Sequence, residues 1–95
     1  MFDRIFLQNF RNHRETEISF SRNLTIFCGE NGAGKTSILE AIYALFFGKS
    51  FRAKKREDFI KFNENFARIR GEKNEISHEI FFEISPRERT IFRKN

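Results

Sequence analysis

One stretch of this sequence combines residue types that could hold a phosphate chain. From Gly29 to Thr36 it reads Gly-Glu-Asn-Gly-Ala-Gly-Lys-Thr, with two glycines separated by four residues and followed by a lysine and a hydroxyl residue. Glycines here let the backbone coil with its amides pointing inward, toward phosphate oxygens. Lys35 supplies a positive charge for the β- and γ-phosphates, and Thr36 supplies a hydroxyl oxygen for Mg²⁺. The spacing predicts a P-loop, whose candidate residues are Gly29, Glu30, Asn31, Gly32, Ala33, Gly34, Lys35, Thr36 and Ser37.

The flanking residues supply the setting that a P-loop needs. Leu24–Cys28 is a short apolar run that predicts a buried strand. A helix is expected from about Lys35 to Phe47, and Gly48 is suited to end it. Its apolar stripe, at helical spacing, is Ile38, Leu39, Ile42, Leu45 and Phe46. The alternative is a tight strand-to-helix turn without a ligand; the glycine order does not match the dinucleotide-binding fingerprint.

Length and composition indicate a single small domain, residues 1–95. The chain is 39% hydrophobic and 33% charged, which is typical of a globular protein. No run approaches the roughly 18 apolar residues of a membrane helix, so a cytoplasmic protein is expected. Cys28 is the only cysteine, which excludes an internal disulfide, and it is interpreted as a small packing residue.

The positive charge of the chain is concentrated in one segment. Residues 49–56 hold five basic side chains and no acidic one, whereas the other residues hold 18 − 5 = 13 basic and 13 acidic side chains. A basic cluster that contains an aromatic residue and follows a nucleotide site favours contact with nucleic acid. The alternative is a solvated loop. The candidate nucleic-acid residues are Arg52, Lys54, Lys55 and Arg56.

Period-two alternation predicts strands on both sides of the helix. Residues 2–10 form the first candidate, with Ile5, Leu7 and Asp3 on one face. A turn at 11–14 leads to a second strand in which Thr16, Ile18 and Phe20 alternate with polar residues. These two strands are expected to be antiparallel because their connection is too short for a crossover.

The C-terminal half predicts a helical turn and an antiparallel meander. The turn is expected at 57–60, and Asn63 and Asn65 mark a loop. The meander strands are expected at Ala67–Lys73, Ile76–Ile84 and Thr90–Arg93, joined by short links. The last residues resemble a truncated hairpin. The expected fold class is α/β, an antiparallel β-subdomain beside a strand–P-loop–helix unit.

Hydrolysis of a triphosphate needs further groups. A Mg²⁺-binding carboxylate is required at the end of a second apolar strand, together with a residue that orients the attacking water. Glu83 is interpreted as a strand-face residue, while Glu30 lies in the loop and Glu40 on the helix. His13 and His78 are isolated in the sequence and indicate no metal site. We therefore expect binding of a triphosphate without efficient hydrolysis by this chain alone, and no catalytic residue is assigned.

Several segments together resemble a known family. They are Asn9–Asn12 (NFRN), the P-loop at 29–36, Leu39–Tyr43 (LEAIY) and Gly48–Arg52 (GKSFR). In this combination they resemble the N-terminal lobe of RecF, a DNA replication and repair ATPase related to SMC- and ABC-type heads. The resemblance runs from about Phe2 through Gly71.

The resemblance implies a P-loop NTPase fold, a partial ABC-type ATPase head. It implies ATP and Mg²⁺ as cofactors and places Arg11 and Asn12 near the nucleotide phosphates or ribose. Family members bind single-stranded or gapped DNA, form ATP-dependent homodimers, act with RecO and RecR, and serve replication, recombinational repair and the SOS response. Lys49 stands where arginine is expected, and the arm domain, signature motif and carboxylate strand are absent. An N-terminal fragment or truncated reading frame is expected.

Two alternatives remain open on the sequence. One is another SMC- or ABC-type ATPase head. The other is a non-catalytic nucleotide- or DNA-binding module, or a remnant with neither activity.

Overall fold

The computed structural model describes residues 2–19, 32–48 and 55–95. Within these residues, two strands precede the helix and three follow it, and a short 3₁₀ turn, η2, lies between the helix and the last three strands. The elements are β1 (Arg4–Phe10), β2 (His13–Ser19), α1 (Gly32–Phe47), η2 (Arg56–Asp58), β3 (Phe66–Lys73), β4 (Ile76–Glu83) and β5 (Arg89–Lys94). The expected strand Leu24–Cys28 and Phe20 lie outside the described residues.

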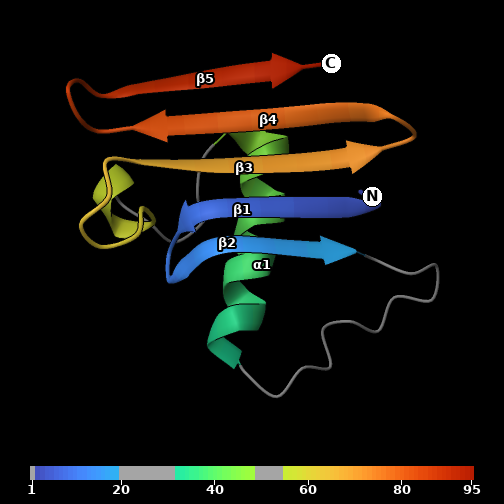
Figure 1. The fold of residues 1–95 in the computed structure, drawn as a ribbon, viewed down its shortest axis with the longest axis horizontal. Coiled ribbons are helices and arrows are strands. Elements are labelled where there is room, and N and C mark those ends of the chain that lie inside the picture. Colours follow the sequence, from blue (N-terminus) through green and yellow to red (C-terminus); the bar gives the residue numbers. More distant parts are fainter. Residues whose placement is uncertain (1, 20–31, 49–54) are drawn as a thin grey trace.

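The strands form one antiparallel sheet in the order β2-β1-β3-β4-β5 (Figure 1). The antiparallel pairing of β1 with β2 and the meander of β3 to β5 were both predicted and are confirmed. β1 and β3 join these two parts into a single sheet, in a register that runs from Arg4 opposite Glu72 to Gln8 opposite Arg68. The observed meander strands differ from the predicted ones by one residue at some ends, and η2 begins one residue before the predicted turn.

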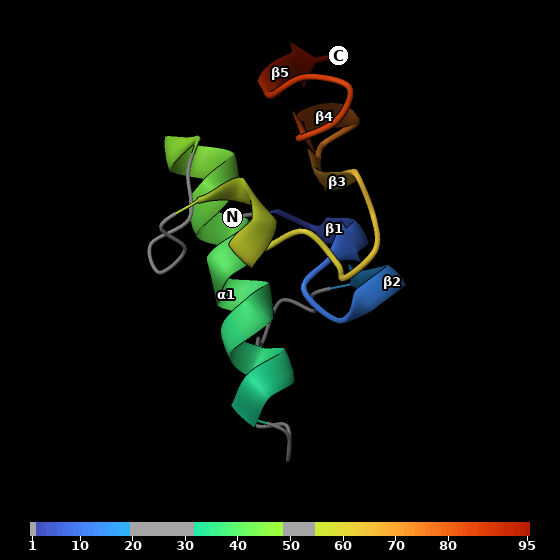
Figure 2. The ribbon, with the colours of Figure 1, turned by 90° about the vertical axis from the view of Figure 1, so that its left-hand side faces the viewer.

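Helix α1 covers one face of the sheet. It runs across the strands in Figure 1 and lies beside the sheet in Figure 2, where it contacts β1, β3 and β4. Alternate side chains of the strands point toward it and exclude water, which is the main source of stability in such a layer. The core comprises Phe2, Ile5, Leu7, Phe10, Ala41, Ala44, Phe59, Ile60, Ala67, Ile69, Ile80 and Phe82.

The helix ends as predicted but begins earlier than expected, at Gly32. Gly48 follows its last residue with φ at 76°, a left-handed conformation that costs glycine little. The Gly48 amide donates to the carbonyl oxygen of Ala44 at 2.7 Å, which satisfies one of the last helical carbonyls. The glycine therefore terminates α1 for the expected reason.

The apolar stripe predicted on α1 contributes only partly to the core, through Ile42 and Leu45, which are half-buried against it. The buried residues are Ser37, Glu40, Ala41 and Ala44, which also have helical i, i+3, i+4, i+7 spacing. Among the residues of the expected stripe, Leu39 is 44% exposed and Phe46 is 61% exposed. Small side chains let the helix approach the sheet closely, so Ala41 and Ala44 lie at the centre of the helix–sheet contact and Ile42 and Leu45 pack beside them.

Two further expectations about the first hairpin were wrong. Asp3 does not share the buried face with Ile5; it is exposed before β1, and its carboxylate accepts a hydrogen bond from the Asn74 amide at 3.2 Å. The turn is also shorter than 11–14, because Phe10 pairs directly with His13. Only Arg11 and Asn12 connect the two strands, so β2 already begins at His13.

Candidate nucleotide-binding site

A hollow of about 430 Å³ lies where the β1–β2 turn, helix α1 and the chain after η2 meet. Two of its lining side chains are cationic, one is acidic, two are polar and uncharged, and two are apolar. The lining residues are Arg11, Asn12, Ser37, Asp58, Ile60, Lys61 and Phe62. Such a surface, cationic with an apolar portion, fits the chemistry of a nucleotide.

The β1–β2 turn is held at this hollow by backbone hydrogen bonds. The Arg11 amide donates to the carbonyl oxygen of Phe59 at 2.6 Å, and the Lys61 amide donates to that of Asn9 at 2.7 Å. An isolated bridge between Phe10 and Ile60 lies between these two bonds. Asn9 and Arg11 have φ at 53° and 55°, and the left-handed Asn9 interrupts the strand alternation so that Phe10 is buried. The turn is therefore fixed against the chain that lines the hollow.

Arg11 forms a two-pronged ion pair with Glu40 of α1. Its Nε donates to Oε1 at 2.9 Å and its Nη2 donates to Oε2 at 2.8 Å. The Glu40 side chain is 0% exposed, and that of Arg11 is 23% exposed. From its place on the predicted helix, Glu40 was not expected to be the Mg²⁺-binding carboxylate. Its helical spacing from Ser37 and Ala44 was the signal that could have indicated a buried position.

The start of α1 brings part of the predicted P-loop beside this hollow. Ser37 is 3% exposed and lines the hollow, and the preceding Thr36 is half-buried. Gly32 to Lys35 form the beginning of the helix, where the first amides have no intrahelical partner and favour anions. Gly29, Glu30 and Asn31 lie outside the described residues, as do the side chains of residues 32–35. Of the predicted nucleotide ligands, the hollow thus joins Arg11, Asn12 and Ser37.

The basic segment is described only at its end. Lys55 is exposed, and its backbone amide donates to Oδ2 of Asp58 at 3.2 Å. Arg52, Lys54 and the side chain of Arg56 lie outside the description. Lys55 leads into η2, which begins at Arg56 and whose Asp58 lines the hollow. The segment therefore reaches the candidate site by its C-terminal end.

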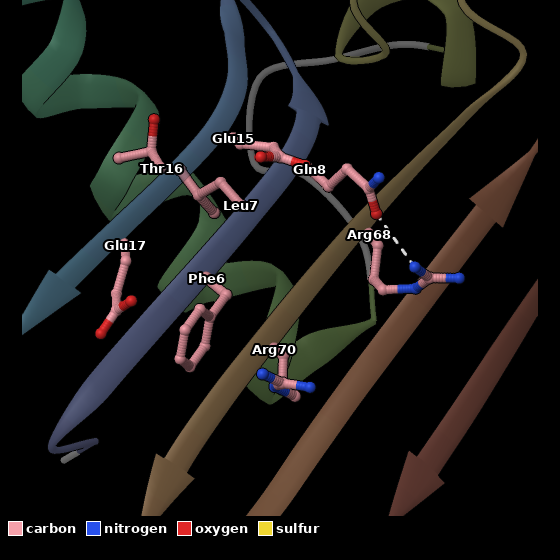
Figure 3. A pocket seen from close by; sticks show the side chains of 8 residues that line it. All are labelled: Phe6, Leu7, Gln8, Glu15, Thr16, Glu17, Arg68 and Arg70. Atoms are coloured by element: carbon pink, nitrogen blue, oxygen red, sulfur yellow. Dashed lines mark hydrogen bonds between the residues drawn. The ribbon is translucent and has the colours of Figure 1, made fainter.

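A second hollow, of about 400 Å³, lies on the face of the sheet opposite α1 (Figure 3). Arg70 stacks on the ring of Phe6 with 4.4 Å between Cζ and the ring centroid, and Nη1 of Arg68 donates to Oε1 of Gln8 at 2.9 Å. Arg68 also approaches Glu79 at 3.4 Å. Arg70 approaches Glu72 at 3.8 Å, so both arginines of this hollow lie beside a glutamate and it favours anions less than the first hollow does.

Glu83 and His13 both make contacts within the sheet. Glu83 ends β4, and its carboxylate pairs with Arg89 of the neighbouring strand, so its interpretation as a strand-face residue is confirmed. Nδ1 of His13 lies 3.0 Å from Oγ1 of Thr16, and burial lowers the pKa of His13. In the parts of the chain that are described, no three His, Cys, Asp or Glu side chains gather as a metal site. No described helix is long and apolar enough to cross a membrane.

Residues 4–94 match the family model described as an AAA domain. The chain belongs to this family. Curated relatives of this AAA domain include the DNA replication and repair protein RecF of Leptospira biflexa, 39% identical over 80 residues, and that of Geobacillus thermodenitrificans, 38% identical over 79 residues. These matches cover 84% and 83% of this chain but 22% and 21% of the relatives. This chain thus spans about a fifth of the length of these relatives.

Solved structures agree with the sequence relatives. The structure of the recombination mediator protein RecF-ATP in the RecFOR pathway matches this AAA domain with a TM-score of 0.79 and 28% identity. The match covers 99% of this chain and 26% of that one. The predicted resemblance to RecF and the predicted fold class, a partial P-loop ATPase head with an antiparallel β-subdomain, are both confirmed.

Proposed function

We propose that residues 1–95 are the ATP-binding N-terminal lobe of a RecF-type protein, which acts in the cytoplasm in DNA replication, recombinational repair and SOS induction. The observation that supports this most strongly is the likeness to the RecF-ATP structure over 99% of the chain. The P-loop spacing and the cationic hollow beside the start of α1 support it independently.

In this proposal the phosphates lie in the loop Gly29–Thr36, with Lys35 on the β- and γ-phosphates. Thr36 would hold Mg²⁺ through its hydroxyl oxygen, and the ion would neutralise charge on the phosphates. Arg11, Asn12 and Ser37 would border the nucleotide. Their meeting at one hollow, although they come from the β1–β2 turn and α1, supports this assignment.

We propose that the lobe binds ATP but does not hydrolyse it efficiently by itself. The best candidate for a Mg²⁺-binding carboxylate in the sequence, Glu83, is paired with Arg89 on the sheet. Efficient turnover would then require groups from the remainder of a longer protein or from a second copy. An ATP-dependent homodimer, and work with RecO and RecR on single-stranded or gapped DNA, belong to the same proposal.

Direct binding of ATP tests the central claim. Isothermal titration calorimetry with ATP and Mg²⁺ should give saturable binding to the wild-type chain. Lys35→Ala should weaken it by about tenfold or more, because each 1.4 kcal/mol of lost interaction is tenfold in affinity. Lys73→Ala removes an exposed lysine at the end of β3 and should leave binding unchanged.

Equal binding by the wild type and Lys35→Ala would remove the P-loop assignment. A chain that binds neither ATP nor DNA would instead fit a remnant. Binding of ATP without any affinity for DNA would favour a nucleotide-binding module or another SMC- or ABC-type head.

A further inference from the structure

The ion pair between Arg11 and Glu40 is the most buried charged pair among the described residues. The Glu40 side chain has no exposed surface, whereas the glutamates that pair with Arg4, Arg68, Arg70 and Arg89 on the sheet are 14–50% exposed. Burying a charged pair in this way gains little stability over apolar residues of similar size, because both groups lose their hydration. A contribution to the stability of the fold therefore does not by itself explain why a charged pair is buried here.

The geometry of the pair fixes the direction of the guanidinium group. Glu40 accepts from Nε and Nη2, which form one edge of the planar fork, and a two-pronged contact allows little rotation. The backbone of Arg11 is held at the same time by its amide bond to Phe59. The side chain is thus fixed at its base and along one edge.

The other terminal nitrogen, Nη1, has no hydrogen-bond partner within the described part of the chain. Arg11 lines the hollow beside Ser37, which directly follows Thr36. In the proposed function, Thr36 would hold a Mg²⁺ ion, which would neutralise charge on the terminal phosphates. Nη1 therefore belongs to a side chain at the end of the site where the terminal phosphates would lie.

We propose that Glu40 is a positioning residue, which holds the guanidinium group of Arg11 so that Nη1 donates to a terminal phosphate of a bound nucleoside triphosphate. This inference rests on the proposed ATP-binding function. Glu40 itself touches no ligand. It acts by making the charge of Arg11 available in one orientation, so that little side-chain entropy is lost when the phosphate binds.

The test compares the affinities for ATP and AMP in matched variants of the full chain. Glu40→Gln keeps the shape of the side chain but loses the charge and one of the two acceptors. We expect the ratio of ATP affinity to AMP affinity to fall by about tenfold, the value for a loss of 1.4 kcal/mol. Arg11→Lys, which keeps the charge but loses the fork, should lower the ratio similarly and guards against misfolding of the first variant.

A purely structural role would give a different result. Partial unfolding lowers the affinities for ATP and AMP by the same factor, so their ratio stays constant. Glu17→Gln is the matched control, because Glu17 forms an exposed pair with Arg4 at 3.6 Å on β2, away from the hollow. It should leave both affinities unchanged.

A double-mutant cycle completes the test. If Glu40 acts through Arg11, then Arg11→Ala should lower the ratio in the wild type but add little in the Glu40→Gln background. An unchanged ratio in Glu40→Gln, with normal ATP binding by the wild type, would overturn the positioning role alone. Failure of the wild type to bind ATP would overturn the proposed function together with it.

Discussion

The ring of Phe2 lies directly against the backbone of Gly71 in β3. A Cβ atom added to Gly71 would come within 2.6 Å of Cδ1 of Phe2, closer than such atoms approach in folded proteins. Phe2 has little room to move, since it is 8% exposed and its ring centroid lies 5.6 Å from that of Phe46 and 6.1 Å from that of His78. Glycine at this position lets the N-terminal residues cover the sheet.

Gly71→Ala is therefore expected to lower the free energy of unfolding by about 1–3 kcal/mol, the usual cost of overpacking a core. Urea denaturation of the two proteins measures the difference. The control is the same substitution in a Phe2→Ala background, where the added methyl group has space and should cost little. Equal costs in both backgrounds would mean that the Phe2 contact is not the cause.

Removal of the buried carboxylate of Glu40 should destabilise the fold strongly. Glu40→Ala leaves the charge of Arg11 without its partner, which for buried pairs costs about 3–5 kcal/mol. We expect the lower end of this range, since the Arg11 side chain is 23% exposed and can be partly rehydrated. For Glu17→Ala, urea denaturation should show a loss of only about 0–1 kcal/mol in the free energy of unfolding, because the pair of Glu17 with Arg4 is half exposed. Similar losses in the two variants would contradict the special burial of Glu40.

Stability should fall when the pH is lowered below about 6.5, the ordinary pKa of histidine. Burial lowers the pKa of His13 in the folded protein, so the unfolded chain binds more protons at this site and protonation favours unfolding. This contribution is absent above the unfolded pKa and grows as the pH falls toward the folded one. Urea denaturation between pH 7.5 and 5.5 measures the slope. His13→Gln should reduce it, and an unchanged slope in that variant would assign the dependence to other groups.

Binding of single-stranded DNA should depend on salt through the basic segment. Glutamine at Arg52, Lys54, Lys55 and Arg56 should flatten the plot of log affinity against log salt, because each lost phosphate contact lowers the slope by about 0.7. A control variant with the same loss of charge carries glutamine at four exposed positions elsewhere: Lys73, Arg87, Arg93 and Lys94. If both variants change the slope equally, net charge alone explains the binding and the segment is only a solvated loop.

Local signals in the sequence determined most of the secondary structure. The alternation in the strands, the short links between β3, β4 and β5, and Gly48 at the end of α1 depend on neighbouring residues, so they were predictable to within about a turn. The P-loop assignment also comes from the sequence, because its chemistry requires a fixed spacing from Gly29 to Thr36, and it stays a prediction.

Only the tertiary structure decided how these parts meet. Two contacts join residues far apart in the chain: the pairing of β1 with β3 and the bond from Arg11 to Glu40. The burial of the Ser37–Ala44 face of α1 likewise depends on the sheet against which the helix packs. Side-chain type predicts that Leu39 is buried and Glu40 is exposed, yet close helix–sheet packing favours the small alanines, and Arg11 supplies the partner that permits a buried carboxylate. The sequence by itself thus predicted the loop that could hold phosphates and named Arg11, and the fold determined how Arg11 is held against α1.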